Sequence, residues 1–300
     1  MDFLHMLEKI RNPIVDNLML AVTSFGEETA LLVIALIVFW CVNKRHGYYI
    51  MSVGFIGSIT NQFMKLWFRI PRPWVRDPSL TAVEGSVEGA GGYSFPSGHT
   101  QTAVGLLGAV AVTTRRRWLC GISMLGAVLV GFSRMYLGVH TPEDVLVGAV
   151  QSVLLLLILY PLIYGQEGKR IPWVLGAQIL LAAAYLVYVE LLDPVGLDGH
   201  NYESGLKNAY TFIGCTIGLL VVWFADRKLN FSTDALWWGQ LLKVGLGLLV
   251  VLAVKEGMRI PLEALCGGHM IARAIRYFLI VVVAGVVWPL TFRFVPKENS

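Results

Sequence analysis

Charge is what this sequence has least of. Only 15% of its 300 residues are Asp, Glu, Lys or Arg, compared with about 25% in soluble domains. The formal net charge is only +4, and the basic residues lie in short clusters between apolar runs. This pattern argues against a nucleic-acid-binding surface. With 56% hydrophobic residues and a mean hydropathy of +0.64, the composition indicates a polytopic membrane protein.

Cysteines are also few, and they lie far apart. The four are Cys41, Cys120, Cys215 and Cys266, and none forms a C-x-x-C pair. This spacing argues against a zinc site and against a disulfide framework. No glycine-rich nucleotide-binding loop is present. We also expect no cleavable signal peptide, because the first residues lack a basic segment followed by an apolar core.

Long apolar runs are abundant. A membrane-spanning helix needs about 20 mostly apolar residues. Nine candidate spans are predicted, at 28–43, 47–67, 99–114, 117–136, 143–164, 171–192, 208–225, 237–255 and 272–293. No series of alternating ten-residue strands indicates a barrel. The predicted fold class is therefore all-α, a polytopic membrane helical bundle.

The N-terminal segment, residues 1–27, has apolar residues at helical spacing. They are Phe3, Leu7, Ile10, Ile14, Leu18 and Val22. This periodicity predicts an amphipathic segment that lies in the membrane interface. A helix packed against the bundle is the alternative.

Short basic connections predict the orientation in the membrane. If the spans alternate, the basic connections all fall on one side, at 43–47, 115–117, 168–170, 226–228 and 293–297. The positive-inside rule makes that side cytoplasmic. The connections 68–98 and 137–142 then face the extracytoplasmic side. The first of these is itself basic at Arg69, Arg72 and Arg76, which suggests a functional reason for the charge.

Three polar clusters fall on the predicted extracytoplasmic side. "KLWFRIPRP" contains Lys65 and Arg72, and "PSGH" ends at His99, where the third span opens. "SRMYLGVHTPED" contains Ser133, Arg134, His140 and Asp144. Two span ends and two span starts therefore bring three cations and two histidines to one region.

This combination suits a phosphate group. Ser97 is a predicted helix N-cap, which leaves the amides of Gly98 and His99 free for an anion. Lys65, Arg72 and Arg134 are expected to surround that anion with charge-assisted donors.

The two histidines suit phosphoester cleavage without a metal. One imidazole can attack phosphorus while the other protonates the leaving oxygen. A carboxylate beside the nucleophile would hold its tautomer, and Asp144 follows His140 by four residues. His99 is then predicted to be the acid and base at the rim of the phosphate site.

Each residue alone has a structural interpretation. Asp144 fits a capping box that begins at Thr141, and Ser97 fits a simple helix cap. Lys65 and Arg134 fit basic side chains that extend to the membrane surface, and His99 fits an interfacial histidine. Together, two histidines at two helix starts favour a phosphatase-type site.

The combined pattern K-x6-R-P, P-S-G-H and S-R-x5-H-x3-D resembles the signature of the type 2 phosphatidic acid phosphatase superfamily. Every signature position matches. The resemblance implies a six-helix phosphatase core within 28–192, preceded by the interfacial segment 1–27. About three additional transmembrane helices within 193–300 then follow that core.

The resemblance also implies roles. His140 would form a phosphohistidine, Asp144 would orient it, and His99 would protonate the leaving group and then activate water. Lys65, Arg72, Ser97, Gly98 and Arg134 would hold the phosphoryl oxygens.

No metal or cofactor is expected from the chemistry of this family, and no nucleic-acid partner. The substrate would be a lipid phosphate or diphosphate, such as undecaprenyl diphosphate or phosphatidic acid, at the outer face of the plasma membrane. Two alternatives stay open: a lipid phosphotransferase that uses the same phosphohistidine, and a non-catalytic binder or transporter of anionic lipid.

Overall fold

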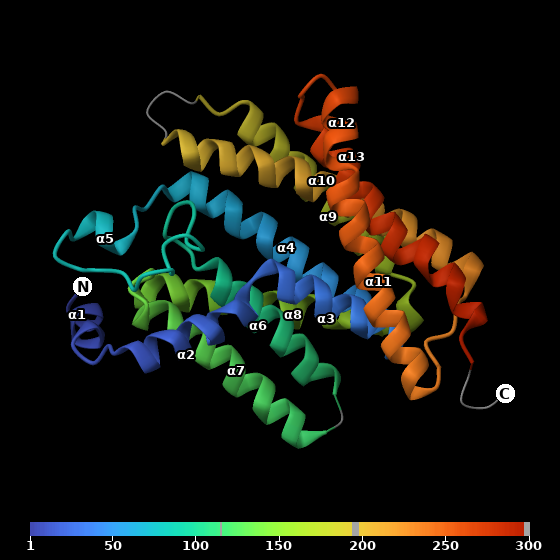
Figure 1. The fold of residues 1–300 in the computed structure, drawn as a ribbon, viewed down its shortest axis with the longest axis horizontal. Coiled ribbons are helices and arrows are strands. Elements are labelled where there is room, and N and C mark those ends of the chain that lie inside the picture. Colours follow the sequence, from blue (N-terminus) through green and yellow to red (C-terminus); the bar gives the residue numbers. More distant parts are fainter. Residues whose placement is uncertain (115, 194–197, 297–300) are drawn as a thin grey trace. The chain divides into compact units, whose positions relative to one another are not determined.

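The computed structural model describes residues 1–114, 116–193 and 198–296. Across these residues the chain is helical and contains no strand, which confirms the predicted all-α class (Figure 1). The α-helices are α1 (Asp2–Glu8), α2 (Pro13–Thr23), α3 (Glu28–Cys41), α4 (Lys44–Phe68), α5 (Pro73–Arg76), α6 (Gly98–Thr113), α7 (Arg117–Tyr136), α8 (Pro142–Tyr164), α9 (Ile171–Glu190), α10 (Gly199–Leu229), α11 (Trp237–Gly257), α12 (Arg259–Leu265) and α13 (Ile271–Val282). Short 3-10 or π segments follow α2, α8 and α13, at 24–26, 165–168 and 283–294.

The predicted spans correspond to helices. In the described part of the chain, six helices are long and apolar enough to cross a membrane, and a seventh span results if α2 and α3 count as one segment bent by 54°. The predicted spans 47–67 and 99–114 form as α4 and α6, which do not meet the same standard. Polar residues interrupt α4, and α6 has only 16 residues. These two helices carry much of the candidate site.

The chain forms two compact units. The first unit comprises 1–32, 56–160 and 193–205, and the second comprises 33–55, 161–192 and 206–300. Each unit therefore combines segments that are distant in sequence. The division into 1–27, 28–192 and 193–300 stays a prediction. Arg115 and Lys297, which belong to two of the predicted basic connections, lie outside the described residues.

The N-terminal segment packs against α7, which agrees with the alternative of a helix packed against the bundle. Tyr136 of α7 donates its hydroxyl to Asp16 at 2.8 Å, and its carbonyl accepts from Arg11 at 2.9 Å. On the other side of α2, Ile14 is 82% exposed. The segment thus has one face on the bundle and one apolar face that is free, and its contact with the membrane interface stays a prediction.

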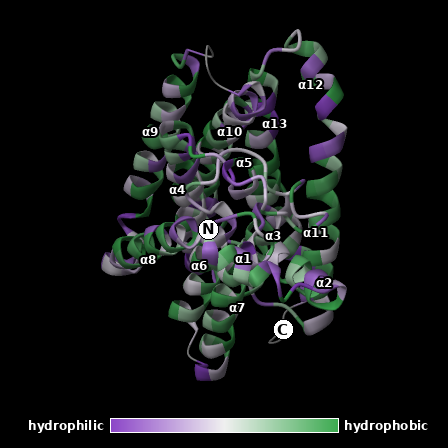
Figure 2. Cartoon of the chain, turned by 90° about the vertical axis from the view of Figure 1, so that its left-hand side faces the viewer, coloured by the Kyte–Doolittle hydropathy of each residue, from purple (hydrophilic) through white to green (hydrophobic). Residues whose placement is uncertain are grey.

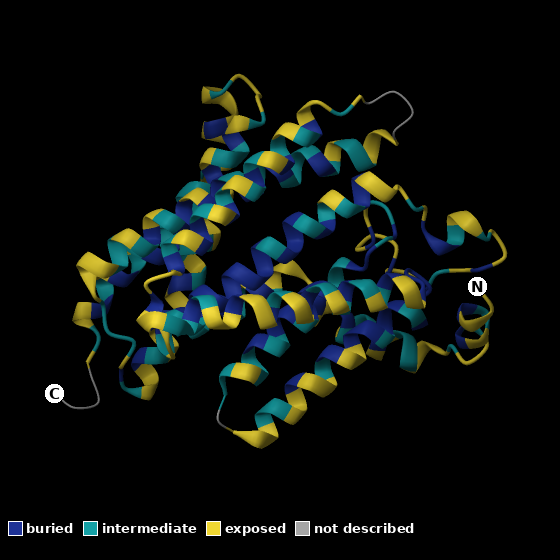
Figure 3. Cartoon of the chain, turned by 180° about the vertical axis from the view of Figure 1, so that it is seen from behind, coloured by how far each residue is buried: buried dark blue, intermediate teal, exposed yellow. Residues whose placement is uncertain are grey.

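In the first unit, the starts of α6 and α8 are joined directly. The backbone amide of Ser97 donates to the backbone carbonyl of Asp144 at 2.9 Å. Gly148, one turn further along α8, lies so close that a Cβ atom there would stand 2.6 Å from the Ser97 carbonyl oxygen. The two helix starts therefore form one rigid floor. Figure 3 shows buried residues on the inner faces of the helices and exposed residues on their outer faces.

The second unit has its own core. The indole of Trp40 donates to the Ala284 carbonyl at 2.9 Å, and the indole of Trp288 donates to the Lys243 carbonyl at 3.0 Å. α9 and α11 are largely hydrophobic along their length, whereas α12 carries hydrophilic residues (Figure 2). The unit is therefore built as a membrane-type bundle with a few polar ties.

Candidate active site

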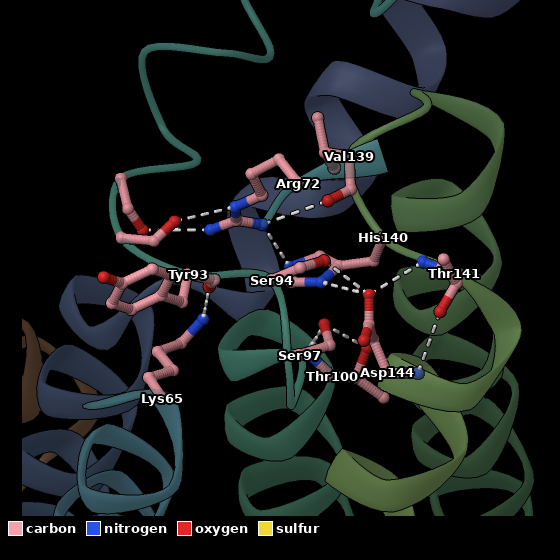
Figure 4. A network of polar contacts seen from close by, with 12 residues as sticks. Lys65, Arg72, Tyr93, Ser94, Ser97, Thr100, Val139, His140, Thr141 and Asp144 are labelled. Atoms are coloured by element: carbon pink, nitrogen blue, oxygen red, sulfur yellow. Dashed lines mark hydrogen bonds and ion pairs between the residues drawn. The ribbon is translucent and has the colours of Figure 1, made fainter. Parts of the chain in front are cut away.

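Arg72 is fixed mainly by main-chain oxygens. It is the N-cap residue of α5, and its side chain is 6% exposed. Nε donates to the Gly92 carbonyl at 3.0 Å, Nη2 to the Gly91 carbonyl at 2.9 Å, and Nη1 to the Val139 carbonyl at 3.0 Å (Figure 4). These bonds hold a buried guanidinium at a single position between the connection 69–97 and the start of α8.

The same guanidinium defines the protonation of His140. Nη1 of Arg72 lies 2.8 Å from Nε2 of His140. Arginine can only donate, so Nε2 must carry the lone pair and the imidazole proton must sit on Nδ1. Nδ1 in turn faces Oδ2 of Asp144 at 3.4 Å. The free electron pair of His140 therefore lies at Nε2, on the side of the arginine.

Asp144 lies behind the histidine and is 2% exposed. Its Oδ2 accepts from the Ser94 hydroxyl at 2.5 Å and from the Thr141 amide at 2.9 Å. Asp144 thus caps α8, as the structural interpretation expected, and also faces the imidazole. The same atom, Oδ2 of Asp144, therefore serves as the helix cap and as the partner of the imidazole.

The start of α6 forms the opposite side of the site. Ser97 is its N-cap, and the Ser97 hydroxyl accepts from the Thr100 amide at 3.4 Å. Lys65, at the end of α4, is 6% exposed and donates to the Tyr93 carbonyl. A helix N-terminus and two buried cations therefore converge.

Most of the predicted site residues line one cavity of about 320 Å³. Lys65, Arg72, Gly98, His99 and His140 all line it. Both histidines therefore face the same space, which is large enough for a phosphate group and part of what it is attached to. Ser97 and Asp144 support the wall from behind.

Arg134 does not line this cavity. It is 1% exposed, and its Nη1 donates to the Thr23 hydroxyl at 2.8 Å. Its carbonyl accepts from the amide of His140 at 3.3 Å, so its backbone positions the histidine. Nε and Nη2 have no hydrogen-bond partner within the described part of the chain. A direct contact of Arg134 with phosphate stays a prediction.

The electrostatics favour a neutral His140. Burial, followed by the positive charge of Arg72, holds the pKa of His140 well below its usual value. Burial also lowers the pKa of Arg72, to about 10. At neutral pH the arginine is therefore charged while the histidine keeps its lone pair.

Sequence reasoning missed three polar residues of the site. Ser94 reaches an oxygen 50 positions away in the chain, which no spacing rule reveals. Asn61 and Gln101 line the cavity and are each 1% exposed. Both Asn61 side-chain atoms and the Gln101 nitrogen lack a hydrogen-bond partner among the described residues. Only the position of Asn61, one helical turn before Lys65, could have indicated it.

No metal cluster is evident. In the regions that the structure describes, no three His, Cys, Asp or Glu side chains lie together as metal ligands. The metal-free reaction stays a prediction from the residues and their resemblance.

Comparisons with known proteins bear on this site directly. The sequence profile of the PAP2 superfamily matches residues 44–167, which contain all eight predicted site residues. A second profile, the transmembrane extension of PAP2 superfamily phosphatases, matches residues 210–299. No solved structure matches the chain.

Curated relatives agree with the profiles. Phosphatidylglycerophosphatase B of Bacillus subtilis is 30% identical over 159 residues, which cover 49% of this chain and 74% of that protein. The undecaprenyl-diphosphatase BcrC of the same organism is 29% identical over 48% of this chain and 72% of its own length. Sphingosine-1-phosphate phosphatase 1 of Rattus norvegicus is 24% identical over 69% of this chain, which spans half of that protein. With these matches, and with both histidines facing one cationic cavity, the chain belongs to the PAP2 superfamily and is a membrane phosphatase of that family.

Proposed function

We propose that this protein hydrolyses a lipid phosphate or diphosphate through a phosphohistidine on His140, at the extracytoplasmic face of the plasma membrane. The observation that supports this most strongly is the tautomer and ring orientation of His140. Arg72 donates to Nε2 while Nδ1 faces Asp144, so the atom with the lone pair is held toward the cationic side of the site.

The first step transfers the phosphoryl group. Nε2 of His140 attacks phosphorus and forms the N–P bond as the bond to the leaving oxygen breaks. Protonated His99 gives its proton to that oxygen. Asp144 accepts the hydrogen bond of Nδ1–H and stabilises the positive charge that develops on the ring.

The second step regenerates the enzyme. His99, now neutral, accepts a proton from water as the water oxygen attacks phosphorus. The N–P bond breaks, its electron pair returns to Nε2, and phosphate leaves. Water therefore supplies the oxygen of the phosphate and the proton that restores His99.

The cations act on the charge of the transferring group. Lys65, Arg72 and the amides at the start of α6 would contact the three phosphoryl oxygens, where the transition state spreads its charge. Arg72 would exchange its bond to Nε2 for a bond to a phosphoryl oxygen. Arrival of substrate would thereby free the nucleophile.

The unpartnered amides support a diphosphate substrate. Asn61 and Gln101 line the same cavity as the histidines, and they offer N–H donors that no protein group satisfies in the described residues. Buried donors of this kind are rare in folded proteins unless a ligand or water uses them. A second phosphate, beyond the one that reacts, would do so. The similarity to an undecaprenyl-diphosphatase agrees with this choice.

The test is release of phosphate from a panel of lipid monophosphates and diphosphates by the purified protein with chelator present. We expect the diphosphates to be cleaved fastest, and His140→Ala to remove turnover. His46→Ala, which changes a histidine bonded to Tyr164 outside the cavity, should keep it. Incubation with ³²P-labelled substrate should leave an acid-labile label on the wild type. Turnover that persists in His140→Ala would contradict the assignment.

A further inference from the structure

A second cavity lies within the second unit, and none of the predicted site residues lines it. Its volume is about 480 Å³, and it is formed by the end of α11, by α12, by the start of α13 and by Lys207 of α10. Hydrophilic residues mark α12 and the start of α13 in Figure 2. The ends of membrane-spanning helices are expected to lie in the headgroup layer, and this cavity is formed at such ends.

The lining of this cavity is strongly basic. It contains five basic side chains, at Lys207, Lys255, Arg259, Arg273 and Arg276, against two carboxylates. Glu263 pairs with Arg259 at 3.5 Å, and Glu256 lies 3.8 Å from Lys255. The carboxylates are therefore engaged with α11 and α12, while the start of α13 contributes positive charge alone.

Two arginines of α13 are placed to bind an anion. Arg276 is 8% exposed, and its Nε has no hydrogen-bond partner in the described part of the chain. Nε of Arg273 donates to the Thr211 hydroxyl at 2.7 Å, which fixes its orientation. The two guanidinium carbons lie 5.3 and 5.5 Å from the centre of the Tyr277 ring. Both groups are thus ordered in advance, and no carboxylate among the described residues forms an ion pair with either.

We propose that this cavity is a second binding site for a phosphate group, held by Arg273 and Arg276. Fixed, planar guanidinium groups match the geometry of phosphate oxygens and bind them through paired hydrogen bonds. A buried arginine without a partner is unfavourable unless an anion compensates it. The site is independent of the phosphatase mechanism, because none of its lining residues lines the cavity of His99 and His140.

The phosphate could belong to free inorganic phosphate or to the headgroup of an anionic lipid, and two measurements separate these sources. In the first, the purified full-length protein in uncharged detergent is dialysed against ³²P-phosphate. We expect two sites per chain. Arg273→Gln with Arg276→Gln should weaken one of them at least tenfold and leave the other, whereas Arg72→Gln should remove only the other.

In the second measurement, the protein is reconstituted in vesicles of phosphatidylcholine and phosphatidylglycerol, extracted in mild detergent, and weighed with its retained lipids by native mass spectrometry. Retained phosphatidylglycerol that is lost in the double variant assigns the site to a lipid headgroup. Phosphate binding that is lost without any difference in retained lipid assigns it to free phosphate.

The matched control is Arg227→Gln with Lys228→Gln, which removes two charges at the other end of α10. Equal yield, gel-filtration profile and melting temperature of the two double variants exclude misfolding. If the Arg273 and Arg276 variant binds phosphate and phosphatidylglycerol as the control does, the proposal is wrong. If Arg72→Gln keeps both phosphate sites, the phosphatase site is misassigned while this inference stands.

Discussion

One carboxylate oxygen of Asp144 accepts from the Ser94 hydroxyl and the Thr141 amide and also faces Nδ1 of His140. The two shorter bonds fix the carboxylate, and the carboxylate then fixes the ring. Ser94 therefore contacts His140, the proposed nucleophile, only through Asp144. We accordingly propose that Ser94 is a positioning residue that does not touch the reacting atoms.

At Asp144, we expect Asp144→Asn to lower kcat by on the order of 10³- to 10⁴-fold, because an amide in that place favours the wrong histidine tautomer. Ser94→Ala should lower kcat by about ten- to hundredfold, through loss of one hydrogen bond to a charged group. KM should change little in either variant, since neither side chain lines the cavity. Steady-state kinetics on a lipid diphosphate measure this split. A rise in KM with kcat unchanged would contradict the positioning role.

Asn61 gives a prediction about substrate choice. In Asn61→Leu, kcat/KM for a lipid diphosphate should fall about tenfold, the effect of losing a hydrogen bond to a charged group. The value for the matching monophosphate should stay within about twofold. Replacing an unsatisfied buried amide by an apolar group of similar shape should leave the melting temperature equal or higher. An equal loss for both substrates would contradict recognition of a second phosphate.

Among the elements, the pair α6 and α8 determines the geometry of the site. Each helix begins beside a histidine of the candidate site, and the amide of Ser97 is bonded to the carbonyl of Asp144. Close packing at Gly148 brings the two helix starts together. The distance between His99, the proposed proton donor, and His140, the proposed nucleophile, is therefore set by this helix pair.

Substitution at Gly148 tests this packing. Gly148→Ala should destabilise the fold by about 1–3 kcal/mol, because its methyl group overlaps the Ser97 carbonyl. It should also reduce turnover, because it displaces the start of α6. Gly121→Ala on α7, where a Cβ atom would meet nothing within 4 Å, should stabilise by about 0.5–1 kcal/mol. Denaturation curves and phosphate release of both variants check this. Equal behaviour of the two would show that the contact does not matter.

The helices were predicted well from the sequence, because the length of an apolar run can be read from consecutive residues. The predicted spans 117–136 and 171–192 match α7 and α9 closely. The motif residues were also placed correctly at helix ends and starts. The 54° bend between α2 and α3 was not predicted, because Gly26 and Glu27 carry no sequence signal that sets an angle.

The contacts of the long connection 69–97 were beyond sequence reasoning. Arg72 donates to the carbonyls of Gly91, Gly92 and Val139. Every residue has a backbone carbonyl, so the residue types do not indicate these contacts. For a related reason, the sequence could not show that Arg134 is absent from the residues that line the cavity. The spacing that brings it near the site does not say which way its side chain turns.

At the scale of the whole molecule, different comparisons match different parts of the chain. The two Bacillus subtilis relatives cover about half of it, and the transmembrane-extension profile covers 210–299. That extension lies entirely within the second unit, where the cavity of Arg273 and Arg276 lies. A phosphate-binding role would give the added helices a purpose of their own.

The proposed sidedness is tested on the whole chain in intact cells. In a background without the four native cysteines, Glu88→Cys reports on the connection 69–97 and Lys169→Cys on a basic connection. A membrane-impermeant maleimide should label the first in intact cells and the second only after permeabilisation. Labelling in the reverse order would place the active site on the cytoplasmic side.

Lys65 and Arg72 are anchored to the carbonyls of residues 91–93 and 139, which every amino acid supplies alike. Except at Gly92, whose φ of +79° favours glycine, the side chains of these residues can therefore be exchanged without moving the two cations. Proteins with this arrangement can differ in the side chains that surround the phosphate and still bind the phosphate through the same two cations. That freedom offers a physical reason why relatives are named for substrates as different as undecaprenyl diphosphate and sphingosine 1-phosphate.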